Sequence, residues 1–176
     1  QNGIRLAYLT QHPEYAKEDT VFSFACKDTD ESDWQAMSEV KSILNRLGFT
    51  DYEEKMEHLS GGQKKKAALA RTLAGKFDVL LLDEPTNHLD EAMLQWLEDY
   101  LNRFKGTVIM VTHDRYFLDR VSNRILEISH GSIYSYEANY SKFLELKAQR
   151  EEMELASERK RQSILRIEME WAKRGC

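Results

Sequence analysis

An acidic pair follows the most apolar run of this 176-residue chain: residues 77–82 read FDVLLL, and Asp83 and Glu84 come directly after them. Such a run predicts a strand buried on both faces in a parallel sheet, and α/β sheets bind ligands at the carboxyl ends of their strands. Asp83 could hold Mg²⁺, usually through water, because a hard cation prefers oxygen ligands. Glu84 could orient or deprotonate an attacking water. A solvated acidic turn would explain an isolated Asp-Glu, but the PTNHLD that follows argues against it.

The pentapeptide LSGGQ, residues 59–63, is a second candidate site, ahead of a lysine run and an apolar helical pattern. Ser60 is placed to cap that helix, while Gly61 and Gly62 let backbone N–H groups approach a phosphate closely. The positive end of the helix favours an anion at the same place. A bare SGGQ would be a turn and cap, but its position one helix before the acidic strand favours a phosphate contact through residues Ser60, Gly61, Gly62 and Gln63.

Two polar residues end other predicted strands. His113 follows VIMVT, where it could contact a γ-phosphate and pair with Glu84. Gln11 ends the first predicted strand, where its amide could ligate Mg²⁺ or water. A loop histidine or glutamine is more often structural or solvated, so both assignments depend on the neighbouring motifs.

The sequence lacks a phosphate-cradling loop of the form Gly-x-x-x-x-Gly-Lys-[Ser/Thr]. The one Gly-Lys pair, Gly75-Lys76, has Ala70 where the first glycine belongs and Phe77 where the hydroxyl belongs. It also runs from a helix to a strand, the reverse of the required order. We therefore expect the chain alone neither to bind nor to hydrolyse ATP appreciably, since the lysine and loop that hold the β- and γ-phosphates are missing.

Hydrophobic periodicity predicts an α/β layer architecture. The pattern is helical and polar between residues 14 and 56, with an apolar face that ends at Gly48. Further elements are expected as helices over 60–73 and 91–104, a strand over 107–111, a helix beginning near 114, and a hairpin of 124–128 with 132–136. After Asn139 charged residues dominate and neither Pro nor Gly occurs before Gly175. This stretch predicts a long charged helix, with a sparse, coiled-coil-like seam of Ile164, Ile167 and Trp171.

Composition narrows the class of protein. The net charge of −5 does not indicate nucleic-acid binding by the chain as a whole, although residues 142–174, with nine Lys/Arg and seven Asp/Glu, carry +2. Two cysteines give no disulfide framework and suggest a reducing compartment. No apolar run is long enough to cross a bilayer. We expect a cytoplasmic protein without a transmembrane segment.

The motifs LSGGQ, LLLDEPTNHLD and VTHD, in this order, resemble the nucleotide-binding domain of the ATP-binding-cassette (ABC) superfamily over roughly residues 4–140. The resemblance implies ATP and Mg²⁺ as ligands. It also implies these positions: Gln11 in the Q-loop, 59–63 as the signature motif, 79–83 as the Walker B strand, Glu84 as the catalytic glutamate, 87–90 as the D-loop with Asp90 at the nucleotide, and His113 as the switch histidine.

The adenine-contacting strand and the Walker A loop of that family have no counterpart, which suggests a fragment of a chain that begins earlier. The expected organisation is a partial nucleotide-binding domain, 1–137, with a parallel sheet core and a helical signature subdomain at 12–59, then the start of a helical interdomain linker, 138–176. In that family two domains meet head to tail. Residues 60–63 would therefore grip the γ-phosphate of ATP held by a partner domain, while Glu84 and His113 would serve the ATP of their own cradle.

The TNHLD variant and the charged helix resemble the ABC-F class of soluble ATPases with two cassettes in one chain. That resemblance implies a second ABC domain of the same parent chain and the ribosome, with its rRNA or tRNA, as partners, in translation or antibiotic protection. Basic residues such as Arg159, Lys160, Arg161 and Arg166, or Lys64–Lys66, could meet RNA phosphates; a solvated helix face is the alternative. An ATPase subunit of a membrane transporter is the main rival. A chromosome-maintenance ATPase fits less well, because there the coil precedes the signature half, and a binding module without activity is the third alternative.

Overall fold

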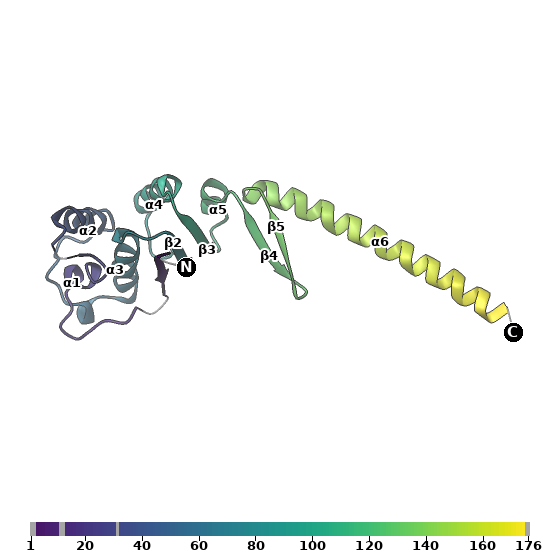
Figure 1. The fold of residues 1–176 in the computed structure, drawn as a ribbon, viewed down its shortest axis with the longest axis horizontal. Helices are drawn as coiled ribbons and strands as arrows, with labels where there is room; N and C mark the ends of the chain where they lie inside the picture. Colours follow the sequence, from purple (N-terminus) through teal and green to yellow (C-terminus); the bar gives the residue numbers. More distant parts are fainter. Residues whose placement is uncertain (1–2, 11–12, 31, 175–176) are drawn as a thin grey trace. The chain divides into compact units, whose positions relative to one another are not determined.

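Three parallel strands carry the acidic pair (Figure 1): β1 (Leu6–Leu9), β2 (Val79–Asp83) and β3 (Thr107–Val111), in the order β1-β2-β3. The computed structural model describes residues 3–10, 13–30 and 32–174. The chain divides into two units, residues 1–117 and 118–176, and the sheet belongs to the first. The strands lie where the apolar and β-branched runs predicted them. Gln11, expected to ligate Mg²⁺, lies outside the described residues.

The expectation that β2 is buried on both faces is wrong for one face. Leu80 and Leu82 are 1% and 2% exposed, on the face of the sheet where helix α3 (Gly61–Ala74) packs against β1. Leu81 is only half-buried, and its neighbours in register, Tyr8 and Ile109, are 54% and 52% exposed. A continuous apolar run identifies a strand but does not show that something covers both of its faces. Within the described residues, one face of the sheet stays open.

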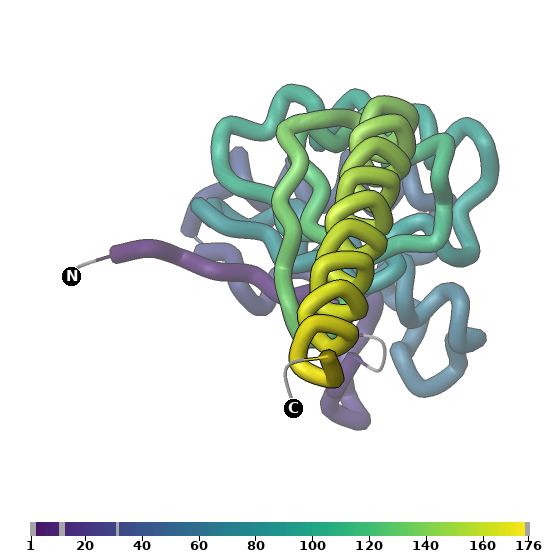
Figure 2. The backbone as a smooth tube through the Cα atoms, turned by 90° about the vertical axis from the view of Figure 1, so that its right-hand side faces the viewer, coloured from purple at the N-terminus to yellow at the C-terminus, as the bar shows by residue number. Residues whose placement is uncertain are grey.

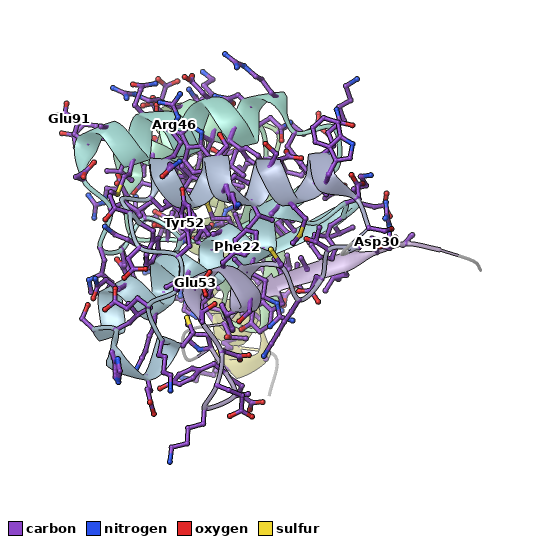
Figure 3. The ribbon with its side chains drawn as sticks, turned by 90° about the vertical axis from the view of Figure 1, so that its left-hand side faces the viewer. Phe22, Asp30, Arg46, Tyr52, Glu53 and Glu91 are labelled. Carbon is purple, nitrogen blue, oxygen red and sulfur yellow. The ribbon has the colours of Figure 1, made fainter. Side chains whose placement is uncertain are left out.

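The polar helical pattern between residues 14 and 56 gives two α-helices and intervening loops, rather than one continuous helical stretch. Thr20 and Asp33 cap α1 (Val21–Ala25) and α2 (Trp34–Arg46) through side-chain oxygens that accept backbone N–H groups. The predicted apolar face of α2 is confirmed, since Val40, Ile43 and Leu44 are at most 4% exposed. Figure 3 views this side of the unit and labels Arg46 at the end of α2. The elements are α1 (Val21–Ala25), α2 (Trp34–Arg46), the short 3₁₀ helix η1 (Met56–His58) and α3 (Gly61–Ala74).

Helix α4 (Glu91–Arg103) follows the acidic strand and is tied to α3. Leu97 and Leu101 of α4 are buried, at 0% and 8% exposure. The Tyr100 hydroxyl donates a hydrogen bond of 2.6 Å to the carbonyl oxygen of Leu73, in the last turn of α3. This bond satisfies one of the carbonyl groups that a helix end leaves without an intrahelical donor. The two helices are thereby joined at the end of α3 remote from LSGGQ.

The second unit holds an antiparallel hairpin and one long helix: β4 (Ile125–Ser129), β5 (Ser132–Tyr136) and α6 (Tyr140–Arg174). His130 and Gly131, with φ of +49° and +75°, make the two-residue turn that the sequence predicted. Helix α5 (Arg115–Val121) spans the border between the units. The domain boundary expected at 137/138 stays a prediction.

The root of α6 is fixed to the hairpin by ion pairs. The Glu127 carboxylate, whose side chain is 11% exposed, binds the ammonium group of Lys147 and, at 3.0 Å, the guanidinium group of Arg150. The same guanidinium lies 3.7 Å from the centre of the Tyr134 ring. Beyond residue 150 every described residue of α6 is exposed, and Figure 2 shows this part running on as one helix. The long charged helix is thus confirmed, whereas the coiled-coil seam stays a prediction. None of the helices in the described part of the chain combines the length and apolarity needed to span a membrane.

Candidate active site

The acidic pair lies at the carboxyl end of the central strand. Asp83 ends β2 opposite Val111 of β3, and the Glu84 N–H donates a 2.8 Å hydrogen bond to the Val111 carbonyl. At Glu84 the backbone turns out of the strand with φ of +48°, a conformation uncommon for residues other than glycine. Both carboxylates line a pocket of about 540 Å³. The other residues lining this pocket are Thr86, Asn87, His88, Val111, His113 and Asp114.

His113 and Glu84 meet in this pocket. The His113 Nε2 atom lies 3.5 Å from Glu84 Oε1, and the His113 backbone N–H donates a long hydrogen bond of 3.4 Å to Glu84 Oε2. The Glu84 side chain is 12% exposed, whereas that of His113 is 98% exposed. A carboxylate largely withdrawn from solvent can accept a proton from a water held beside it. The exposed imidazole can donate a hydrogen bond to an anion that enters from solvent.

Two threonines hold the walls of the pocket together. The hydroxyl oxygens of Thr86 and Thr112 lie 3.0 Å apart, and Thr112 Oγ1 also accepts the Asp114 N–H at 3.2 Å. The bond between the two threonines joins the loop after β2 to the loop after β3, and the Asp114 bond holds the second loop. Sequence reasoning missed the threonine pair, although both threonines lie within the motifs LLLDEPTNHLD and VTHD. It placed Asn87 and His88 in the D-loop without assigning them to this pocket.

Asp83 is suited to bind a Mg²⁺ ion whose other ligands come mostly from water and nucleotide phosphates. Among the described residues there is no cluster of three or more His, Cys, Asp or Glu side chains able to hold a metal ion. Asp83 and Glu84 nevertheless place two carboxylates in one pocket. Mg²⁺ characteristically binds through one or two carboxylates together with water and substrate phosphates. Asp83 would therefore hold the ion, which would neutralise charge on the phosphates of a bound nucleotide.

The LSGGQ segment forms the start of α3, as predicted. Ser60 Oγ accepts the Gln63 N–H at 3.3 Å, while Gln63 Oε1 accepts the Ser60 N–H at 2.9 Å. This reciprocal capping box occupies both polar side chains. The amide groups of Gly61 and Gly62, at the first two helical positions, cannot form intrahelical bonds. They are the donors that this helix start can offer to a phosphate.

The structure groups the predicted site residues in two places. Asp83, Glu84 and His113 share one pocket, and residues 60–63 do not line it. The side chain of Asp90 caps α4, because its Oδ1 atom accepts the Met93 N–H at 2.9 Å. Its expected contact with nucleotide stays a prediction.

Comparison with known families agrees with this geometry. Two family models, both described as ABC transporter, match residues 1–87 and 126–175. The ABC transporter ATP-binding protein YfmR of Bacillus subtilis is 50% identical over 143 residues, which are 81% of this chain and 23% of that protein. The energy-dependent translational throttle protein EttA of Haemophilus influenzae is 36% identical over 99% of this chain and 38% of its own length. The EttA of Escherichia coli strain K12 is 44% identical over 78% of this chain and 25% of its own length.

Solved structures show the same fold. An ATP-binding subunit of an ABC transporter matches with a TM-score of 0.64 at 18% identity, over 76% of this chain and 59% of that one. The archaeal ribosome recycling factor aABCE1, solved with a ribosomal stalk protein, matches with a TM-score of 0.60 at 29% identity, over 77% of this chain and 27% of that one. The chain thus spans between 23% and 38% of the length of these curated relatives. With the family models, the relatives and the pocket geometry in agreement, the chain belongs to the ATP-binding-cassette family of ATPases.

Proposed function

We propose that this chain supplies two separate parts of an ATP-hydrolysing machine. Asp83 holds Mg²⁺, Glu84 activates the attacking water and His113 contacts the γ-phosphate, all at one nucleotide. Residues 60–63 contact the γ-phosphate of a second nucleotide, held by another ABC domain. The meeting of Glu84 and His113 in one pocket at the end of β2 carries this proposal.

The whole protein is proposed to be a cytoplasmic, ABC-F-type ATPase with two cassettes that acts on the ribosome. Support comes from two proteins that this chain resembles, an energy-dependent translational throttle and a ribosome recycling factor. The relatives are also much longer than this chain. Residues 138–176 would open the linker between the cassettes, where Arg159, Lys160, Arg161 and Arg166 are all exposed and free to meet RNA phosphates.

A transporter ATPase subunit is the second candidate. It is supported by the ATP-binding subunit whose fold this unit shares. The two candidates differ in what they bind, since one predicts salt-sensitive association with ribosomes and the other a membrane-embedded partner. Sedimentation of the tagged whole protein through a sucrose gradient at two salt concentrations separates them. Co-migration with ribosomes at low salt supports the first candidate, and co-purification with a membrane protein supports the second.

Titration calorimetry with Mg-ATP tests the division of the site. The chain alone should show no binding, because the loop that cradles the β- and γ-phosphates is supplied elsewhere. In the whole protein, Glu84→Gln should lower kcat about 100- to 10,000-fold, the usual contribution of a positioned general base, and change KM little. The exposed Glu91→Gln, on α4, is the matched control and should leave both constants unchanged. Micromolar ATP binding by the chain alone, or an unaltered kcat in Glu84→Gln, would contradict the proposal.

A further inference from the structure

The His88 side chain lies against the start of α3 and also lines the acidic pocket. A methyl group built at Gly62 would lie 3.1 Å from Cγ and 3.3 Å from Nδ1 of His88, closer than side-chain atoms normally approach. The same construction at Gly61 meets nothing within 4 Å. The His88 ring therefore covers the second helical position of α3 and leaves the first position open.

His88 also forms part of the acidic pocket. Its side chain lines that pocket together with Asp83, Glu84 and His113. It stands four residues after Glu84 on a loop closed by backbone bonds, from the Asn87 N–H to the Glu84 carbonyl at 3.4 Å and from the Leu89 N–H to the Thr86 carbonyl at 3.3 Å. The loop is further held by the bond between Thr86 and Thr112. A shift of Glu84 would therefore be passed to His88 along a short, hydrogen-bonded segment.

The backbone conformation of His88 directs the ring. Its φ is +67°, in the left-handed region that few residues other than glycine adopt, although histidine, asparagine and aspartate do so more readily. Such a conformation persists only where the surrounding structure holds it.

We infer that His88 is a positioning residue that sets the placement of the Gly61 and Gly62 amides relative to the acidic pocket. The ring acts as a spacer between the loop that carries Glu84 and the start of α3. Binding of one nucleotide in the acidic pocket thereby changes the position of residues 60–63, which contact the other nucleotide. The ring also occupies the space that a side chain at residue 62 would need. The contact itself is independent of the proposed function, whereas its effect on hydrolysis rests on it.

Thermal unfolding of the chain tests the contact without any nucleotide. Gly61→Ala should raise the unfolding midpoint by roughly 2–4 °C, because alanine favours a helix over glycine and the site is open. Gly62→Ala should fail to raise it, since the new methyl group meets the His88 ring. In a His88→Gly background, which tolerates positive φ and removes the Cβ, Cγ and Nδ1 atoms that lie nearest the new methyl group, Gly62→Ala should raise the midpoint as much as Gly61→Ala does. Equal shifts for both alanines in the native background would overturn the inference.

Steady-state ATP hydrolysis by the whole protein tests the positioning role. Gly62→Ala should lower kcat about tenfold, because displacing a binding segment by a few tenths of an ångström costs less than the roughly hundredfold loss expected for 1 Å. Adding His88→Gly should restore kcat to within about twofold of His88→Gly alone, an outcome not expected if the loss came from a change elsewhere in the fold. Unrelieved loss in the double variant would refute the role of the ring. If the unmutated protein does not hydrolyse ATP at all, the proposed function is refuted. The contact between His88 and Gly62 would still be tested by the unfolding midpoints.

Discussion

Replacing Tyr100 by phenylalanine removes one oxygen atom that joins α4 to α3. The Tyr100 hydroxyl donates a 2.6 Å hydrogen bond to the carbonyl oxygen of Leu73, a residue that is 2% exposed. A neutral hydrogen bond contributes about 0.5–1.5 kcal/mol net, and a carbonyl left without a donor in a buried position costs somewhat more. The free energy of unfolding should fall by about 1–2 kcal/mol. For a chain of this length that lowers the unfolding midpoint by roughly 2–8 °C.

The pH dependence of this difference is a sharper test than its size. Burial, together with the nearby charge of Glu39, raises the pKa of Tyr100 to about 12, against 10.0 for a free tyrosine. A raised folded-state pKa means that the contribution to stability is complete below pH 10 and is lost as the pH rises through 12. Two pKa units correspond to about 2.7 kcal/mol, which partial exposure of the ring reduces to roughly 1–1.5 kcal/mol. The advantage of the native protein over Tyr100→Phe should therefore be constant to about pH 9.5 and shrink towards zero near pH 12.

Urea unfolding followed by circular dichroism, at fixed pH values between 7 and 11.5, measures this advantage. Tyr116→Phe is the control, because Tyr116 is 85% exposed and its replacement should change nothing at any pH. An advantage that grows above pH 10, or that is absent at pH 7, would refute the reasoning. The first result would mean that the folded state favours the tyrosinate, and the second that the hydroxyl contributes nothing to the joint.

Two further perturbations test the core and the root of α6. Leu97→Ala should lower the free energy of unfolding by about 2–5 kcal/mol, because Leu97 is 0% exposed. Leu155→Ala, at a residue that is 57% exposed, should lower it by less than about 0.5 kcal/mol. Equal losses of the two variants in urea titrations would contradict the burial of Leu97 in the core. The hydrogen bond from Lys147 lowers the pKa of Glu127, so its contribution to stability is present above the ordinary glutamate value of 4.5 and is lost as the pH falls through the lowered folded-state pKa. Glu127→Gln should remove this acid-sensitive part of the stability of the second unit. Thermal unfolding at several pH values measures it. The same pH dependence in the variant and the native protein would argue against the ion-pair cluster.

Local patterns predicted most of the fold. The strand Thr107–Val111 has the bounds that its β-branched run indicated, and Ser60 caps the start of α3 as its type and position suggested. The two-residue turn at His130-Gly131 was also predicted. In each case the signal lies within a few residues along the chain, where periodicity, capping and turn preferences act.

Properties that depend on distant residues were not predictable in the same way. The expected pairing of His113 with Glu84 is confirmed, but it was expected from the neighbouring motifs, whereas the 3.5 Å separation itself depends on the register of β2 with β3. The contact of His88 with Gly62 joins residues 26 positions apart, and no local pattern signals it. The prediction that both faces of the sheet are covered was wrong for the same reason. Hydrophobicity indicates a tendency to be buried, but it does not identify the segment that would cover a given face.

That open face has a consequence for the behaviour of the chain in a test tube. Leu6, Tyr8, Ile109 and Val111 together place four apolar side chains, each more than half exposed, on the outer strands of a parallel sheet. Contiguous apolar surface of this kind promotes association, and sheet edges offer unpaired backbone groups to a neighbouring molecule. The mass measured by light scattering should therefore rise with protein concentration. Expression should improve with a chaperone that shields apolar strands, and charged substitutions at Tyr8 and Ile109 should keep the chain monodisperse without disturbing the acidic pocket.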